Sequence, residues 1–209
     1  MPRRVITLAR TLGAGGEEIG NLVAKELGLR YADDEIIIEA AERAGVPKET
    51  VARFEHPPGL IGRILDTMAV IPLDPQMYYG QALTEPVAGA RGGGYDQLIR
   101  QVIAETARRG DVLIVAHGAS IALAGVAGVL RVFVTAPVEV RAARVAAQSG
   151  IDLKDATKAI ENSDRERRDF LRRAYDLAHE EPANYDLVVS TETLSPEAAA
   201  VIIAAAARD

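Results

Sequence analysis

A strand-like segment that runs directly into closely spaced glycines is the part of this chain best suited to chemistry. Residues 5–12 are mostly apolar, and Gly13, Gly15 and Gly16 follow before a helical pattern begins. Such glycines let successive backbone N–H groups point into one concavity, at the positive end of the next helix. The segment favours a phosphate-binding loop, with an ordinary strand-to-helix turn as the alternative. The candidate phosphate-binding residues are Gly13, Ala14, Gly15, Gly16, Glu17 and Glu18.

This loop lacks the side chains that make a phosphate loop specific. In the pattern G-x-x-x-x-G-K-[ST], the lysine reaches the outer phosphates and the hydroxyl holds Mg²⁺. Here Gly16 and the acidic residues Glu17 and Glu18 occupy that stretch. The carboxylates suit a helix start but repel phosphate unless a metal ion or arginines intervene. Arg10, just before the loop, is a candidate for the missing charge, and a plain surface cation is the alternative.

A second cluster of cations lies on one face of a predicted helix, with Arg165, Arg168 and Arg172 at helical spacing. Guanidinium groups that converge on phosphates suit phosphoryl transfer, where catalysis is mainly positioning and charge neutralisation. The alternative is a solvated helix with i,i+4 ion pairs, each worth about a few tenths of a kcal/mol. Those pairs would be Asp164–Arg168 and Asp169–Arg173.

Strand and helix patterns alternate along the chain, which predicts an α/β fold with a doubly wound, five-stranded parallel sheet. The β-branched runs are typical of central strands covered on both faces. The predicted strands are Val5–Ala9, Leu29–Ala32, Val112–Ala116, Arg131–Thr135 and Asp186–Ser190. Helices are expected to start at Glu17 and to cover about Asp96–Arg108, Pro137–Gln148 and Leu153–His179, with a last one capped by Ser195.

The stretch 35–94 differs from the rest because prolines divide it and Gly92-Gly93-Gly94 closes it. It is predicted to be a largely helical insertion. Tyr78 and Tyr79 are candidates for a base pocket or, more simply, for the insertion's own core. Apolar residues in 60–73 suit a homodimer surface or the same core.

Composition narrows the classes of function. The 209 residues suffice for a single domain, 1–209, and include no cysteine, which fits a cytoplasmic protein and excludes thiolate metal sites. The net charge of −6 argues against a nucleic-acid polymer as partner. Apolar runs are too short for a membrane span, and the histidines are too scattered to suggest a metal site.

Five segments together resemble the cytidylate-kinase-like family of P-loop kinases over nearly the whole chain. They are V-I-T-L-A-R-T-L-G-A-G-G-E-E-I-G, L-G-L-R-Y-A-D-D-E-I-I, V-L-I-V-A-H-G-A, D-R-E-R-R and Y-D-L-V-V-S-T-E-T-L-S-P-E. The resemblance implies a P-loop kinase sheet with ATP phosphates on the glycine loop and Mg²⁺ bound with the ATP. It also implies that 35–94 forms an acceptor-binding lobe and that 152–182 forms a lid carrying Arg165 and Arg168.

By the same resemblance, Asp33 lies by the acceptor, with Asp34 beside it, and the acceptor is CMP or a similar monophosphate. His117 departs from the family, which usually has arginine in a G-R-G-A-like turn. An imidazole does not replace a permanently charged, bidentate guanidinium in kind. The expected function is a nucleotide kinase, and the alternative is a nucleotide-binding pseudokinase with a sensing or assembly role.

A hydrolase is a third hypothesis. Gly118-Ala-Ser120 after a predicted strand faintly resembles a nucleophile elbow, with His179 as a nominal base. The elbow's final glycine is missing, so Ser120 is more simply explained as a capping or packing residue.

Overall fold

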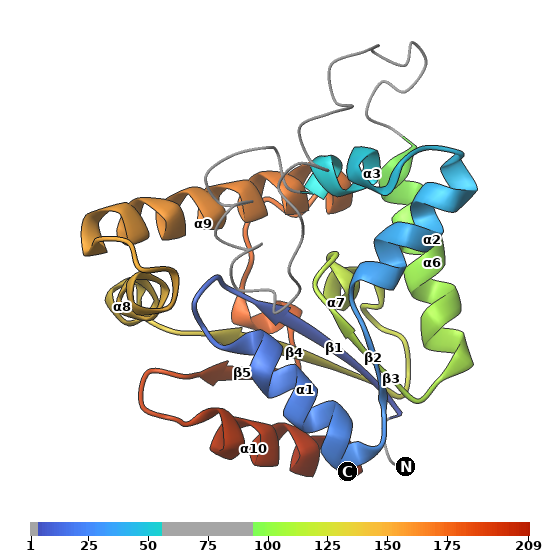
Figure 1. Cartoon of the computed structure of the whole chain (residues 1–209). Helices are drawn as coiled ribbons and strands as arrows, with labels where there is room; N and C mark the ends of the chain where they lie inside the picture. Colours follow the sequence, from blue (N-terminus) through green and yellow to red (C-terminus); the bar gives the residue numbers. More distant parts are fainter. Residues whose placement is uncertain (1–3, 56–93) are drawn as a thin grey trace.

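A five-stranded parallel sheet forms the centre of the computed structural model, which describes residues 4–55 and 94–209 (Figure 1). Its strands are β1 (Val5–Arg10), β2 (Arg30–Ala32), β3 (Val112–Val115), β4 (Val129–Thr135) and β5 (Leu187–Ser190). Every neighbouring pair is parallel, and the spatial order is β2-β3-β1-β4-β5. The predicted sheet is confirmed, with strand ends shifted by one or two residues.

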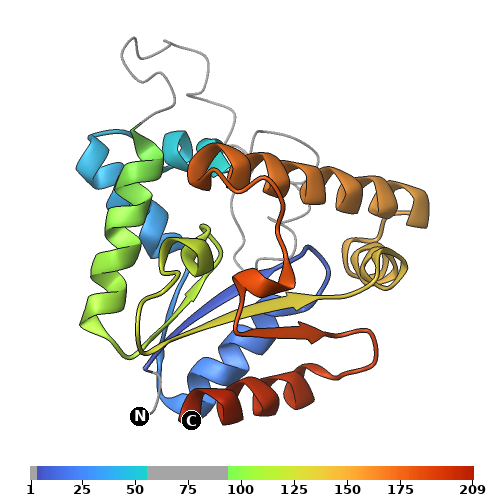
Figure 2. The same cartoon turned by 180° about the vertical axis from the view of Figure 1, so that it is seen from behind.

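Helices cover both faces of the sheet, as the alternating pattern predicts (Figures 1 and 2). They are α1 (Gly16–Leu27), α2 (Asp34–Ala44), α3 (Lys48–Glu55), α6 (Tyr95–Arg109), α7 (Ala119–Ala122), α8 (Val138–Ser149), α9 (Leu153–Tyr175) and α10 (Pro196–Arg208), with a short 3₁₀ helix, Pro182–Asn184. Buried side chains of α1 and α10 pack on one sheet face, and those of α2, α6 and α7 pack on the other. Alternation along each strand supplies apolar side chains to both layers.

Helix α9 lies above the carboxyl ends of the strands, where it packs at two places (Figure 2). Its first half contacts α8 through small apolar residues such as Ala142, Ala156 and Ala159. Its second half buries Phe170 and Leu171 in a cluster that includes Phe54 of α3. The helix ends at Tyr175, four residues before the predicted His179, because Asp176 adopts a left-handed conformation, with φ of 52°.

Residues 35–55, the first part of the predicted insertion, contribute to the main core. Ile36 and Ala40 of α2 share one apolar cluster with α6 and with strand residues such as Ile114. The remainder, 56–93, lies outside the described residues, together with Tyr78, Tyr79 and the apolar stretch 60–73. In the two stretches that are described, no helix is both long and apolar enough to cross a membrane.

Candidate functional site

A cavity lies between the glycine loop, the turn after β3 and the underside of α9. It therefore lies beyond the carboxyl ends of β1 and β3, where open α/β sheets usually bind ligands. The lining residues are Arg10, Thr11, Leu12, Glu17, Ala116, His117, Gly118, Ser163, Asp164, Arg167 and Phe170. The fold thus brings together the loop, His117 and the predicted lid helix, which lie far apart in the sequence.

The front of the loop has the backbone geometry that an anion needs. Gly13 and Gly15 both have φ of 79°, and Gly15 caps the N-terminus of α1. A left-handed residue followed by a helix start turns successive N–H groups towards one point. Position 13 requires glycine for two reasons. Its φ is positive, and an added Cβ would lie 2.8 Å from the carbonyl oxygen of Arg141.

The back of the loop is held through its carbonyl oxygens. Arg141 donates to the carbonyl of Leu12 and Arg144 to that of Gly13, both at 3.4 Å, and the Thr191 hydroxyl donates to Ala14 at 2.9 Å. Donors on the carbonyl side orient the peptide dipoles and strengthen the N–H groups on the opposite side. No sequence pattern pointed to these three supports, which come from α8 and from the end of β5.

Arg10 lies at the end of β1 with acidic partners on two sides. Its Nε lies 2.5 Å from Glu17 Oε1, and its Nη2 lies 3.8 Å from Asp33 Oδ2. Burial disfavours the charged guanidinium, but Glu17 and Asp33 outweigh burial and hold the pKa of Arg10 above its ordinary value. Glu18, in contrast, is exposed and does not line the cavity.

The turn after β3 places His117 against Asp33. His117 Nε2 lies 3.0 Å from the carbonyl oxygen and 3.1 Å from Oδ1 of Asp33, so Nε2 carries a proton and donates. Ala116, His117 and Gly118 all have positive φ, and the Tyr175 hydroxyl donates to the His117 carbonyl at 2.7 Å. A Cβ on Gly118 would lie 2.2 Å from the Tyr175 ring, so this turn requires glycine.

The structure brings only part of the predicted acceptor pair to the site. Asp33 contacts His117 and Arg10 at the cavity, whereas Asp34 begins α2 and is exposed. The contact between Asp33 and His117 spans 84 residues, so local patterns could not reveal it.

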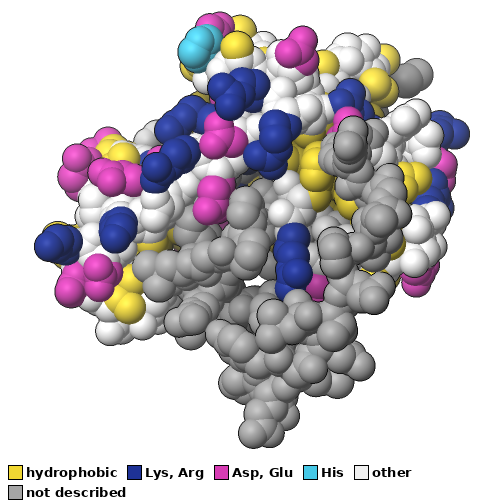
Figure 3. Space-filling model, turned by 90° about the horizontal axis from the view of Figure 1, so that it is seen from above, with side chains coloured by type: hydrophobic (Ala, Val, Ile, Leu, Met, Phe, Trp, Pro, Cys, Tyr) yellow, Lys and Arg dark blue, Asp and Glu magenta, His cyan; other side chains and the backbone are white. Residues whose placement is uncertain are grey.

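Helix α9 presents two sets of arginines. The predicted residues Arg165, Arg168 and Arg172 are all exposed on the side away from the cavity. Figure 3 shows dark blue basic side chains on this upper side of the molecule, with acidic ones among them. Arg167, which sequence analysis did not select, lines the cavity. The sequence did contain a signal for Arg167. Phe170 is apolar and marks the face of α9 that points into the protein, and a residue three positions earlier lies on the same face.

Arg167 is fixed in a partly buried ion pair. Its guanidinium donates two hydrogen bonds to Glu180, at 2.5 and 2.9 Å, and lies 5.6 Å from the centre of the Phe133 ring. Burial raises the pKa of Glu180, but Arg167 and the Tyr185 hydroxyl lower it more, so the net direction is down. Tyr185 stacks on Phe133 with centroids 5.0 Å apart, which joins this group to the sheet.

The simpler ion-pair prediction for α9 is wrong in both of its pairs. Asp164 forms a bidentate pair with Arg141 of α8, at 2.7 and 3.0 Å, and not with Arg168. Asp169 pairs with Arg172 at 3.4 Å, while Arg173 donates to the carbonyl of Phe54. Helical spacing identifies possible local partners, but a buried guanidinium on a neighbouring helix competes better for Asp164.

The nucleophile-elbow hypothesis finds no support in the surroundings of Ser120. Its hydroxyl is buried, 2% exposed as a residue, and bonds to Thr7 at 2.9 Å. His179 is exposed in the segment after α9. Within residues 4–55 and 94–209, His, Asp and Glu side chains form no group of three or more that could hold a metal ion.

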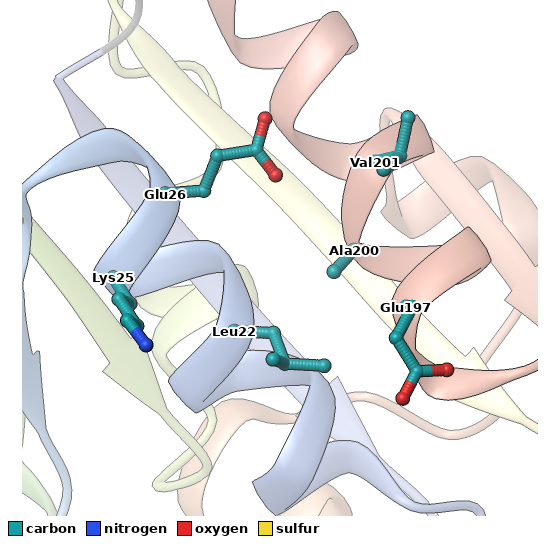
Figure 4. Close-up of a pocket in the computed structure, with 6 residues that line it drawn as sticks. All are labelled: Leu22, Lys25, Glu26, Glu197, Ala200 and Val201. Atoms are coloured by element: carbon teal, nitrogen blue, oxygen red, sulfur yellow. The ribbon is translucent and has the colours of Figure 1, made fainter.

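A separate hollow lies between α1 and α10, away from the glycine loop (Figure 4). Leu22 and Ala200 line it, with Glu26 and Glu197 near its ends. Its mixed lining offers no converging cations for a phosphate. The cavity beneath α9 is therefore the candidate site.

Comparison with known proteins agrees with this geometry. The profile of the cytidylate kinase-like family matches residues 5–193. The chain belongs to this family. A cytidylate kinase of Ignicoccus hospitalis is 27% identical over 195 residues, which are 93% of each chain. One from Methanopyrus kandleri is 32% identical over 110 residues, 49% of this chain and 57% of its own.

Solved structures support the fold of this family member. An uncharacterized protein from Eubacterium ventriosum superposes with a TM-score of 0.67 at 13% identity, covering 97% of both chains. A shikimate kinase from Bacteroides thetaiotaomicron gives 0.50 at 15% identity, covering 95% of both. At such identities the likeness shows the fold alone, which is that of P-loop kinases.

Proposed function

We propose that this protein is a nucleotide kinase that transfers the γ-phosphoryl group of MgATP to a nucleoside monophosphate, with a CMP-like acceptor. The observation that carries the proposal is the cavity in which the residues on either side of the glycines, the cation Arg10 and the cation Arg167 of α9 surround one space. Phosphoryl transfer needs little covalent chemistry from a protein. Positioning and charge neutralisation suffice.

The glycine loop is the proposed site of the ATP phosphates. The loop lies between cavity-lining residues on both sides, Leu12 and Glu17, and its carbonyl groups accept hydrogen bonds from Arg141, Arg144 and Thr191. A loop fixed from behind does not have to reorganise when the phosphates arrive, which is the property that electrostatic catalysis requires. Mg²⁺ would enter with the nucleotide as part of the substrate.

The acceptor is proposed to bind beside Asp33, with α9 acting as the lid. His117 lines the cavity and contacts Asp33, and the two side chains can donate and accept hydrogen bonds to a base or sugar. Arg165, Arg168 and Arg172 are proposed to move over the transferred group when α9 closes. All three side chains are exposed, so each can change partners at little cost, whereas movement of the helix would also have to break the pairs Asp164–Arg141 and Arg167–Glu180.

The test is ADP formation by the purified protein with MgATP and a panel of nucleoside monophosphates. CMP is expected to be the best acceptor. Arg165→Ala and Arg168→Ala should each lower kcat at least about tenfold, because a cation on the transferred group is a major part of such catalysis. Lys158→Ala, which removes another cation of α9 outside the cavity lining, is the matched control and should leave kcat unchanged.

Two results would contradict the kinase assignment. Unchanged turnover in both arginine variants would remove α9 from the mechanism. Saturable MgATP binding without ADP from any acceptor would favour the pseudokinase, for which the absence of a loop lysine and the Arg10–Glu17 ion pair are the supporting observations.

A further inference from the structure

Arg10 occupies the space that a side chain at position 16 would need. A Cβ built on Gly16 would lie 2.6 Å from Cβ and 2.8 Å from Cδ of Arg10. Gly16 is the first residue of α1 and, unlike Gly13 and Gly15, has no positive φ. The backbone therefore tolerates a side chain there, and the clash with Arg10 is what excludes one. Position 16 is where the phosphate-loop pattern carries its lysine.

The guanidinium of Arg10 is also directed to the site. It lines the cavity, and its side chain is 18% exposed. Its acidic neighbours are Glu17, which follows Gly16 in α1, and Asp33, which also contacts His117. The ion pair with Glu17 keeps a long, flexible side chain beside the loop before any ligand is present.

Neighbouring arginines are less suited to this place. Arg167 is bound on two nitrogens by Glu180. Arg144 contacts the loop from behind, through the carbonyl of Gly13 and through Thr191. Arg10 therefore combines access to the cavity with a position against the loop.

We propose that Arg10 is the phosphate-binding cation of this site and that it replaces the loop lysine from the end of β1 instead of the start of α1. The inference rests on the proposed function, because it assigns the charge that holds the nucleotide phosphates. On binding, the guanidinium exchanges a carboxylate partner for phosphate oxygens, which suit its planar fork. Glu17, released from Arg10, would then be available to the Mg²⁺ that accompanies the nucleotide.

The test removes the Arg10 side chain and introduces a lysine at position 16, where the phosphate-loop pattern carries it. MgATP binding is measured by calorimetry on the wild type, Arg10→Gly, Gly16→Lys and the double variant Arg10→Gly/Gly16→Lys. Loss of one charged contact should raise the Kd of Arg10→Gly about tenfold to a hundredfold. Gly16→Lys alone should also bind weakly because it collides with Arg10. The double variant should recover at least about half of the lost log affinity, because glycine at position 10 removes the Cβ, Cγ and Cδ atoms that a side chain at position 16 would meet, and the lysine can then contact the phosphates.

Arg30→Ala is the matched control, because Arg30 also pairs with a glutamate, Glu35, but lies outside the cavity lining. Its Kd should equal that of the wild type, and circular dichroism should show all variants folded. Wild-type affinity in Arg10→Gly would overturn the inference, as would a double variant no tighter than the weaker single variant. If the kinase assignment is wrong, the result is different: MgATP binds normally, but no ADP forms with any monophosphate.

Discussion

Arg167 and Arg168 are neighbours in α9, yet their guanidinium groups lie in different surroundings. Arg167 is 19% exposed and is held on two nitrogens by Glu180, beside Tyr185 and Phe133. Arg168 is exposed, on the same side of the helix as Arg165 and Arg172. One face of α9 is thus anchored to the rest of the protein, and the other is available to a ligand.

The difference separates two uses of the same residue type. A partly buried arginine that is paired on two nitrogens stabilises one position of the helix, and its removal leaves a carboxylate without a partner. An exposed arginine contributes little to stability and can change partner at little cost. We therefore expect stability to depend on the cavity face of α9 and turnover to depend on its exposed face.

The largest effect on stability is expected for Arg167→Met. This change keeps the apolar contact with Phe133 but leaves Glu180, 13% exposed, without its cation, which should lower the free energy of unfolding by about 3 kcal/mol. Arg168→Met, one residue further on, should change it by less than about 0.5 kcal/mol. Urea denaturation followed by circular dichroism measures both. Equal losses in the two variants would mean that the faces are not energetically distinct.

The sequence predicts the fold and the glycine loop, but not which face of α9 is anchored and which is exposed. The β-branched strands and the glycines at 13, 15 and 16 are local patterns, and each encodes one element. Helical spacing also showed correctly that Arg165, Arg168 and Arg172 share a face. It could not show which face meets the cavity, because that depends on where α8, α9 and the sheet pack.

The supports behind the loop were unpredictable for the same reason. Arg141 and Arg144 contact loop carbonyls that lie 129 and 131 residues earlier in the chain. In the sequence both look like ordinary helix arginines, since a guanidinium that bonds to a backbone carbonyl requires no particular residue type as its partner. Contacts of this kind become visible only when the strands place α8 beside the loop.

The next prediction concerns pH and is intermediate in size. The pKa of Glu180 is lowered in the folded state, so the unfolded chain binds the extra proton first as the pH falls. The stability that this carboxylate contributes is complete above its ordinary pKa of about 4.3 and is lost as the pH falls through the folded value. The advantage of the wild type over Glu180→Gln should therefore shrink as the pH falls from neutral to about 3, which urea denaturation at each pH measures.

Arg167→Met gives this pH experiment a second arm with a larger change. Without the guanidinium, burial is the main influence on Glu180 and raises its pKa, so protonation stabilises the folded variant. The stability gap between the wild type and Arg167→Met should narrow on acidification more than the gap to Glu180→Gln. A gap that stays constant from neutral to acidic pH would show that the ion pair does not set the protonation of Glu180.

The smallest effect is expected at the exposed pair of Arg172 and Asp169, whose atoms are 3.4 Å apart and whose side chains are 68% and 47% exposed. Arg172→Ala should change the free energy of unfolding by less than about 0.5 kcal/mol, and salt should reduce that further. The same variant should lower kcat, because Arg172 is proposed to join Arg165 and Arg168 over the transferred group. Paired urea and ADP assays on one preparation measure both quantities. A stability loss as large as that of Arg167→Met would make Arg172 a structural anchor, whereas a kinetic loss without a stability loss is what a side chain reserved for the ligand requires.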